Sequence, residues 1–260
     1  MIDIHCHLLP GLDDGPKDLE DSLSMARIAV ADGIQVIVAT PHTLNGVYLN
    51  HREVILGRTR VLREALAEQN IPLILYPGAD VHFNADLIRR LEAEEVLPIN
   101  GGKYVLLELP NQSVPLTAKE VFFGLRVKGY FPIITHLERN LVIQRELDIV
   151  GDWVQHGAVI QITANSLTGG FGGKAYDCAC RLLERGWVDI IATDAHSAKW
   201  RPPVLSKGLQ SASEIISPAE VLKMVTTYPK SILRNEPLPE KDFSEFSSKP
   251  AKKKIFSRFF

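Results

Sequence analysis

Short runs of apolar, β-branched residues alternate with amphipathic stretches along most of this 260-residue chain. The runs, such as QVIVAT and YVLLEL, are continuously hydrophobic, which is typical of parallel strands covered on both faces. The sequence therefore predicts strands at residues 2–6, 35–40, 73–76, 104–109, 132–135, 159–163 and 188–193.

Helical periodicity fills the segments between these strands. Helices are predicted at residues 18–32, 52–68, 85–95, 117–128 and 175–185. Gly33, Gly129, Gly157 and Gly186 each end a helical stretch just before a strand, as loops from helix to strand prefer. Repeats of roughly 30 residues favour an α/β fold with a closed or nearly closed parallel barrel. An open, doubly wound sheet is the alternative.

Composition excludes several other classes of protein. Apolar residues make up 45% of the chain, charged residues 23%, and the net charge is −2, as in an ordinary globular protein. A nucleic-acid-binding protein would carry a basic excess. Three cysteines are too few for a disulfide framework, and neither a signal-peptide pattern nor a membrane-spanning apolar run is evident. We therefore expect a reduced, cytoplasmic protein without a nucleic-acid partner.

Side chains that bind metals gather where the predicted strands end. In a parallel barrel, the carboxyl ends of all strands face one mouth, where the active sites of such barrels form. We therefore expect these residues to converge on one cavity. They are His5, His7, His42, Asp80, His82, Glu108, His136, Asp194 and His196.

Each of these signals has a plainer alternative. His5 and His7 lie two residues apart on a strand, so they point the same way and can hold one ion, but both could be core histidines. Glu108 lies within the apolar run VLLEL, and burying it unpaired would cost several kcal/mol. Its partner is a metal ion or an arginine. Asp194 and His196 repeat the spacing of two, although a turn aspartate beside a surface histidine would look the same.

Asp13 and Asp14 follow a Pro-Gly turn, just before a predicted helix. Acidic residues favour helix starts, so we expect one of the pair to cap the helix and the other to bind metal.

The ligand types indicate the class of metal site. Histidine and carboxylate without thiolate suit Mn, Fe or Zn in a catalytic cluster. Cys6 alternates away from the two histidines, and Cys178 and Cys180 do not face each other on a helix. The candidates exceed what one ion needs, which predicts two or three divalent ions, an arrangement typical of phosphate-ester hydrolysis.

The motifs DIHCHLLPGLDDGPKDLEDSL, ATPH, GAD, THLERN and ATDAHSAKWRPP together resemble the polymerase-and-histidinol-phosphatase (PHP) superfamily. They are most similar to its bacterial protein-tyrosine phosphatases of capsule and exopolysaccharide synthesis. The resemblance runs from residue 1 to about residue 235. It implies a distorted (βα)7 barrel, similar to a TIM barrel, that holds a trinuclear and commonly manganese-dependent site.

The resemblance also implies three ligand sets. The first is His5, His7, Glu108 and Asp194; the second is Asp14, His42 and His196; the third is Asp80, His136 and a bridging Glu108. The chain departs from the family where Asp80 replaces the usual glutamate, where Leu137 replaces a proline, and in the segment QITANS at residues 161–166. None of these changes removes a ligand type.

Arg139 and Arg201 follow two of the predicted ligands and should stand at the barrel mouth. Guanidinium groups match phosphate oxygens and stay charged, although surface salt bridges are the usual fate of a loop arginine. We expect water activated at the metals to attack phosphorus in line, with His42 or a metal-bound water as the candidate proton donor. A cysteine-dependent mechanism is excluded, because the positions six after each cysteine hold no arginine: Leu12, Glu184 and Gly186.

The predicted function is metal-dependent hydrolysis of phosphotyrosine in a protein, and the resemblance implies a membrane-anchored bacterial tyrosine kinase as substrate. A small-molecule phosphatase, acting for example on histidinol phosphate, and a non-catalytic barrel that binds a phosphoprotein are the alternatives.

Residues 1–235 are expected to form the barrel and 236–260 a tail. The tail ends in three lysines, 252–254, and four apolar residues, which could contact an anionic membrane or dock on a barrel.

Overall fold

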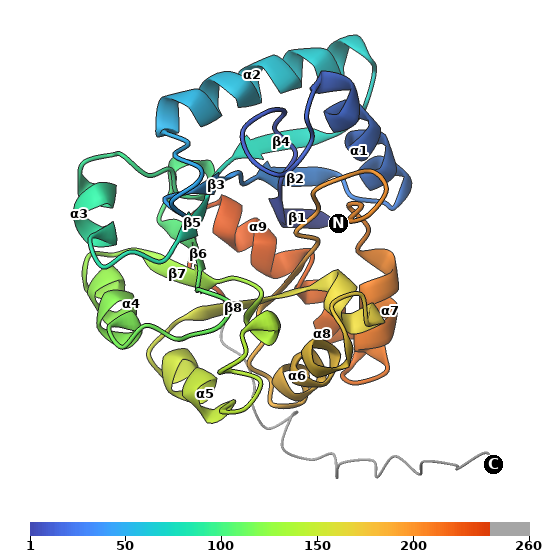
Figure 1. The fold of residues 1–260 in the computed structure, drawn as a ribbon. Coiled ribbons are helices and arrows are strands. Elements are labelled where there is room, and N and C mark those ends of the chain that lie inside the picture. Colours follow the sequence, from blue (N-terminus) through green and yellow to red (C-terminus); the bar gives the residue numbers. More distant parts are fainter. Residues whose placement is uncertain (240–260) are drawn as a thin grey trace, which may run out of the picture.

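The computed structural model describes residues 1–239 and shows parallel strands surrounded by helices (Figure 1). One sheet has the order β1-β2-β4 and the other has the order β3-β5-β6-β7-β8-β9, and every pair within them is parallel. The strands are β1 (Ile2–Cys6), β2 (Val36–Ala39), β3 (His42–Thr43), β4 (Ile74–Pro77), β5 (Asp80–His82), β6 (Tyr104–Glu108), β7 (Phe131–Ile134), β8 (Val159–Thr163) and β9 (Ile190–Ala192).

Two breaks in the strands separate the sheets, and hydrogen bonds carry the ladder across them. β3 continues the line of β2, and β5 continues the line of β4. At the breaks, the amide of Gly78 donates to the carbonyl of Ala39 at 2.9 Å, and the amide of Asp80 donates to the carbonyl of Pro41 at 3.1 Å. Counted as continuous lines, the nine strands occupy seven positions.

The first and last positions meet beside the metal-binding motifs. The amide of Asp194, just after β9, donates to the carbonyl of His5 on β1 at 2.8 Å, and the amide of His7 donates to the carbonyl of Ala195 at 2.9 Å. The strands thus form a closed, distorted barrel. The predicted parallel barrel is confirmed, and the open, doubly wound alternative is wrong.

The helices cover the outside of the barrel. The five helices predicted with bounds are present, with ends within three residues of the prediction. α5 was expected only as a helical stretch that Gly157 ends, and α7 to α9 were not predicted. The helices are α1 (Leu19–Ala31), α2 (Arg52–Glu68), α3 (Leu87–Glu92), α4 (Ala118–Val127), α5 (Asp148–Gln155), α6 (Gly173–Glu184), α7 (Ser206–Ser213), α8 (Pro218–Lys223) and α9 (Thr227–Leu233). Three short 3-10 helices, η1 (Ile99–Gly101), η2 (Leu137–Arg139) and η3 (Ala164–Thr168), lie in the loops.

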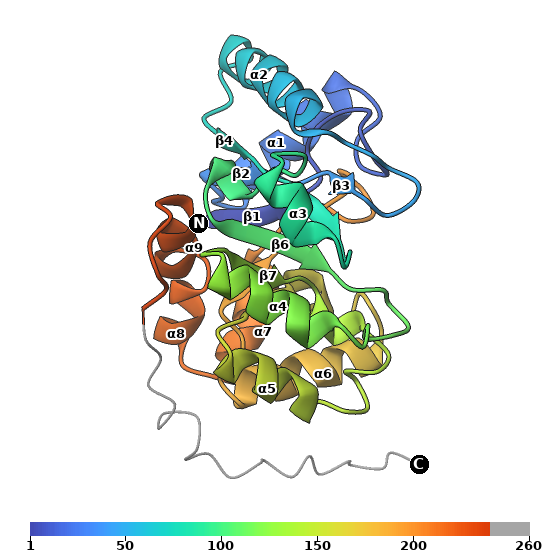
Figure 2. The same cartoon turned by 90° about the vertical axis from the view of Figure 1, so that its left-hand side faces the viewer.

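The last two helices close one end of the barrel. Figure 2 shows α8 and α9 beside the N-terminus, at the end where the strands begin. There the amide of Ile2 donates to the carbonyl of Val225 at 2.8 Å, and the hydroxyl of Tyr104 donates to the carbonyl of Glu236 at 2.7 Å. The opposite end, which faces the reader in Figure 1, is the mouth where the strands end.

No helix within residues 1–239 is long and apolar enough to cross a membrane. The segment 252–260, for which membrane contact was predicted, lies outside the described residues.

Candidate metal centre

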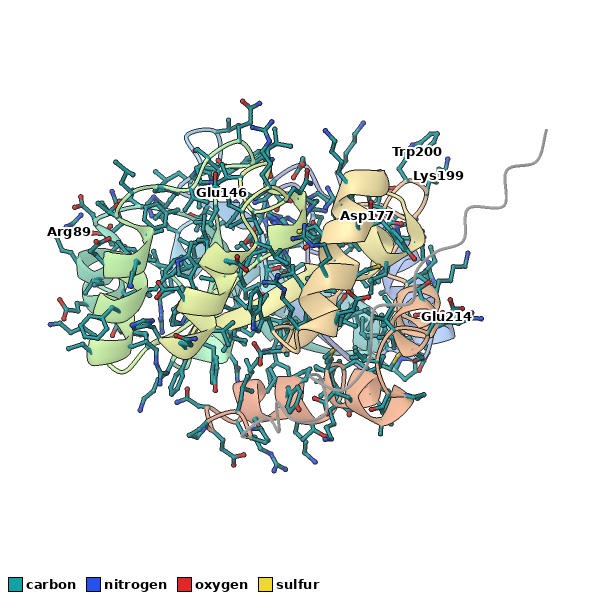
Figure 3. The ribbon with its side chains drawn as sticks, turned by 90° about the horizontal axis from the view of Figure 1, so that it is seen from below. Arg89, Glu146, Asp177, Lys199, Trp200 and Glu214 are labelled. Carbon is teal, nitrogen blue, oxygen red and sulfur yellow. The ribbon has the colours of Figure 1, made fainter. Side chains whose placement is uncertain are left out.

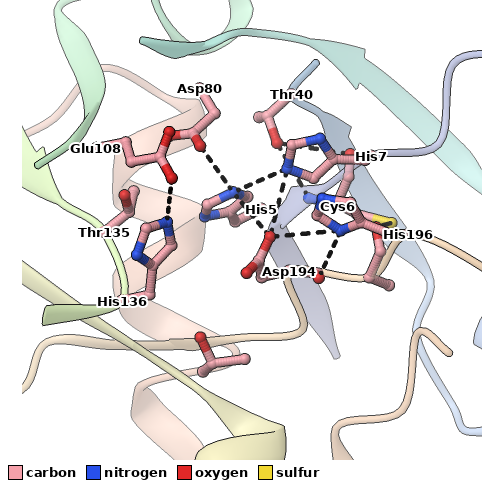
Figure 4. Close-up of polar contacts among 12 residues, drawn as sticks. His5, Cys6, His7, Thr40, Asp80, Glu108, Thr135, His136, Asp194 and His196 are labelled. Carbon is pink, nitrogen blue, oxygen red and sulfur yellow. Dashed lines mark hydrogen bonds and ion pairs between the residues drawn. The ribbon is translucent and has the colours of Figure 1, made fainter. Parts of the chain in front are cut away.

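His5 and His7 form the floor of the mouth. Both side chains are fully buried, and their Nε2 atoms lie 3.3 Å apart (Figure 4). Cys6, between them, points into the core, where it is also fully buried. The spacing of two along β1 explains this alternation, since successive strand residues face opposite sides.

The outer nitrogen of each ring fixes its tautomer. Nδ1 of His5 lies 3.0 Å from Oε1 of Gln161, whose amide nitrogen donates to the carbonyl of Ile162, so His5 must donate to that oxygen. Nδ1 of His7 lies 2.6 Å from Oδ2 of Asp13 and donates to that carboxylate. In these tautomers both Nε2 atoms carry lone pairs that face each other. A cation between the two Nε2 atoms fits this arrangement, because it pairs with both lone pairs.

The charges around His7 also favour a cation at this position. Burial alone would lower the pKa of His7, but the Asp13 and Asp194 carboxylates raise it to about 10. The negative charge around this ring therefore favours a positive charge at Nε2.

A second group lies between β1 and the loop after β9. Nδ1 of His196 lies 2.9 Å from the carbonyl of Asp194, which leaves Nε2 to face Oδ1 of Asp14 at 3.3 Å. Nε2 of His42 lies 3.6 Å from the same oxygen. One ligand atom from each of His7, Asp14, His42 and His196 lies within 4.8 Å of the others, so these four side chains could hold one ion.

Asp80 provides a further test of whether a metal fits. It is fully buried, and neither of its carboxylate oxygens accepts a hydrogen bond from residues 1–239. Its Oδ2 instead lies 3.2 Å from Nδ1 of His42 and 3.6 Å from Nε2 of His5. A buried carboxylate without hydrogen bonds is costly unless a cation pairs with it. Asp80 belongs to two further groups with suitable spacing, one with His5 and His7 and one with His42 and Glu108.

Glu108 is surrounded by imidazoles. Its oxygens lie 3.5 Å from Nδ1 of His42, 3.6 Å from Nδ1 of His82 and 3.5 Å from Nε2 of His136. No arginine in the described part of the chain lies within ion-pair distance of Glu108, so the arginine alternative for this carboxylate is wrong. Burial and the nearby Arg139 lower the pKa of His136, which keeps its ring neutral, as a metal ligand must be.

Asp194 links the histidines to the two arginines. Its Oδ1 lies 3.4 Å from Nε2 of His5 and 3.3 Å from Nε2 of His7. Its Oδ2 accepts hydrogen bonds from Nη2 of Arg139 and Nη2 of Arg201. Burial would raise the pKa of Asp194, but Arg139, His5 and Arg201 hold it well below its usual range. Asp194 is therefore an anion that joins the cluster to both guanidinium groups.

The structure thus brings all the predicted site residues to one place, with some differences in grouping. His7 joins the set of Asp14, His42 and His196, and His5 is grouped with Asp80. Asp194 and His136 lie beside these groups rather than within them. The arginines stand at the mouth, as expected. The side chain of Arg139 is 16% exposed and that of Arg201 is 28% exposed.

Two supporting residues had not been predicted. Asp13 accepts hydrogen bonds from His7 and from the amides of Gly15 and His42, so it orients the ligands. The expectation that Asp13 or Asp14 caps the next helix is wrong, because the side chain of Asp18 caps α1 by accepting from the amide of Asp21. Gln161 orients His5; its only signal was a polar residue inside the buried strand VIQIT.

The chain has close relatives among characterised proteins. It is 38% identical over 236 residues to the tyrosine-protein phosphatase YwqE of Bacillus subtilis (strain 168), covering 91% of this chain and 92% of YwqE. It is 32% identical over 249 residues to CapC of Staphylococcus aureus, covering 94% of this chain and 97% of CapC.

Solved structures agree with the fold. A structure from work on YwqE of Bacillus subtilis and CpsB of Streptococcus pneumoniae, described as unique metal-dependent tyrosine phosphatases, matches with a TM-score of 0.87 at 37% identity. The match covers 93% of this chain and 100% of the other. A histidinol phosphate phosphatase from Lactococcus lactis matches at 11% identity with a TM-score of 0.51. The match covers 90% of this chain and 94% of the other, and it shows a shared fold alone.

A family model described as capsular polysaccharide synthesis, CpsB/CapC, matches residues 1–234. This protein therefore belongs to the CpsB/CapC family.

Proposed function

We propose that this protein is a metal-dependent protein-tyrosine phosphatase that acts in the cytoplasm on a tyrosine kinase of capsule or exopolysaccharide synthesis. One observation carries the proposal: a cluster of facing histidine and carboxylate ligands is joined through Asp194 to two arginines at an open mouth. YwqE is a tyrosine-protein phosphatase, and the structure that matches with a TM-score of 0.87 is described as that of a metal-dependent tyrosine phosphatase, which supports the same reading.

The side chains that would hold two or three ions, manganese in our proposal with iron or zinc as alternatives, are His5, His7, Asp14, His42, Asp80, Glu108, His136, Asp194 and His196. Divalent ions held there would neutralise phosphate oxygens and make water more acidic.

The protein's own residues would place the substrate. Arg139 and Arg201 are held by Asp194, so both positive charges are fixed before a phosphate arrives. Guanidinium groups can bind phosphate oxygens in pairs and neutralise the charge that develops on them. A tyrosine leaving group, with a phenol pKa near 10, needs little protonation. His42, at the mouth, would donate this proton through whichever of its ring nitrogens does not bind metal.

Restoring metal to the stripped protein tests the proposal. Release of phosphate from a phosphotyrosine peptide and from histidinol phosphate would be measured with Mn, Zn or Mg added back, in the wild type, in His7→Ala and in His51→Ala. His51 is exposed and immediately precedes α2, so its variant is the matched control. We expect metal-dependent release from the peptide that only His7→Ala abolishes.

Other outcomes would select the alternatives. Turnover of histidinol phosphate alone would indicate a small-molecule phosphatase, and binding of the phosphopeptide without turnover would indicate a non-catalytic barrel.

The kinase substrate in this proposal is anchored in a membrane, and residues 252–260 would bring the phosphatase to the same surface. Removing the chain from Lys252 onward should then weaken binding to vesicles that contain anionic lipid. Unchanged binding would end the membrane part of the proposal.

A further inference from the structure

A cavity of about 280 Å³ lies beside the metal centre, on the side of the two arginines. Asn165 and Thr168 of η3, Phe171, Arg201 and Lys207 of α7 are among its lining residues. Arg201 belongs to both sites, since its guanidinium group also donates to Asp194. A molecule bound at the arginines could therefore extend into this cavity.

The polar groups around the cavity are mainly donors. No acidic residue lines it, and no carboxylate in the described part of the chain lies within ion-pair distance of Lys207, which is exposed. Oδ1 of Asn165 already accepts a hydrogen bond from the hydroxyl of Thr168 at 3.1 Å, which leaves the amide hydrogens of Asn165 free to donate. An ammonium, a guanidinium and an amide group therefore surround a space without a negative charge.

Asp32 is the carboxylate at the start of α7, and it is already engaged. Its Oδ2 accepts from the amides of Leu205 and Ser206 at 2.7 and 3.0 Å. The helix terminus is thus satisfied by the protein itself, and the cation offered to a ligand is the side chain of Lys207.

Tight packing fixes the backbone of α7 that carries this lysine. A Cβ atom at Gly208 would lie 2.6 Å from the carbonyl oxygen of Ala164, so glycine lets α7 lie directly against η3. On the other side of the cavity, the ring of Phe171 lies 4.5 Å from the guanidinium carbon of Arg139 and 5.5 Å from that of Arg201. α7 and η3 therefore pack closely beside the cavity, and Phe171, which also lines it, contacts both arginines.

We propose that this cavity binds an acidic side chain that flanks the phosphotyrosine of the substrate, with Lys207 as its principal partner. This inference rests on the proposed function. A phosphate held at the arginines would place the neighbouring residues of its polypeptide at the mouth, and the charge around the cavity selects a carboxylate among them. A small aryl phosphate has no group to place there.

Peptides that differ in one flanking residue test this inference. The full-length, manganese-loaded protein would be assayed on phosphotyrosine peptides with Glu, Ala or Lys at each of three positions on either side, and on p-nitrophenyl phosphate. The variants would be Lys207→Ala, Lys207→Glu and Lys199→Ala. Lys199 is the matched control because it is an exposed lysine beside Trp200 in the loop that leads to Arg201 (Figure 3), but it does not line the cavity.

We expect the wild type to prefer Glu over Ala at one position by about 2- to 5-fold in kcat/KM, as for an exposed ion pair. Lys207→Ala should abolish this preference and Lys207→Glu should turn it toward the Lys peptide. Lys199→Ala should keep the preference, and all variants should hydrolyse p-nitrophenyl phosphate like the wild type.

The inference is overturned if the wild type shows no acidic preference, or if Lys207→Ala retains it while the peptides are hydrolysed. Hydrolysis of neither the peptides nor p-nitrophenyl phosphate by the wild type would instead refute the proposed function, and this inference with it.

Discussion

Asp13 accepts a hydrogen bond from Nδ1 of His7 at 2.6 Å, and this contact turns Nε2 of His7 toward the metal centre. Asp13→Ala should lower the affinity for manganese by about 10- to 100-fold, as removal of such a supporting carboxylate does in other metal sites. Titration of the metal against a chelating dye would measure this.

Asp18→Ala is the control for that variant. Asp18 caps α1, so its loss should lower the free energy of unfolding by about 1 kcal/mol and leave the metal affinity unchanged. Equal metal affinity in Asp13→Ala and the wild type would contradict the role assigned to Asp13.

The two arginines should respond to loss of the guanidinium group even when the charge is kept. Arg201→Lys retains a cation but loses the planar fork that can bond Asp194 and a phosphate together. We expect kcat/KM for p-nitrophenyl phosphate to fall by about 100-fold, with the metal content unchanged. Arg185→Lys, on the surface beside Asp148, should have no effect. If Arg201→Lys and Arg185→Lys lower kcat/KM by a similar factor, the proposed role of Arg201 in binding phosphate is wrong.

The thiols should be unreactive in the folded protein. Burial raises the pKa of Cys178 to about 12, and burial also raises the pKa of Cys6 well above its usual value. Because a raised pKa keeps a thiol protonated, the thiolate of Cys178 at pH 8 falls to about one molecule in 10⁴, against about a quarter for an ordinary thiol.

Iodoacetamide at pH 8 should therefore leave the activity intact and modify at most Cys180, which is partly exposed. Mass spectrometry should find all three cysteines modified after denaturation. Rapid inactivation of the folded protein by alkylation would count against a metal-dependent mechanism.

Two glycines should respond in opposite ways to alanine. Gly208→Ala would place a methyl group 2.6 Å from the carbonyl oxygen of Ala164 and should lower the free energy of unfolding by about 1–3 kcal/mol. Gly57, inside α2, has open space around it, so Gly57→Ala should stabilise the protein by about 0.5–1 kcal/mol. Denaturant unfolding would measure both, and a neutral Gly208→Ala would show that α7 can move away from η3.

The strands and the positions of the ligands could be predicted from the sequence because the signals are local. A run such as YVLLEL is apolar over its whole length, and Glu108 is conspicuous within it. The spacing of His5 and His7 places both rings on one side of a strand whatever surrounds that strand. Parallel strands then bring their carboxyl ends to one mouth.

Pro41 and the Pro77-Gly78 pair mark the ends of β2 and β4, but nothing in the sequence predicted that the strands resume as β3 and β5. These breaks depend on how neighbouring strands pair, and they turn His42 and Asp80 into the mouth at the starts of β3 and β5. His136 and Asp194 adopt left-handed conformations, with φ of 35° and 50°. Histidine and aspartate tolerate this region better than most residues, but the sequence does not mark which of them adopt it.

By itself, then, the sequence determined the seven main strand positions, the helices α1 to α4 and α6, the end of the barrel that carries the chemistry, and the ligand types. Only the tertiary structure decided which atoms meet. Asp13 orients His7 instead of capping a helix, and Asp194 contacts two arginines, one of them 55 residues away. Such contacts follow from packing across the barrel, and the local periodicity of a chain does not record which carboxylate another segment will bring to a given ring or guanidinium group.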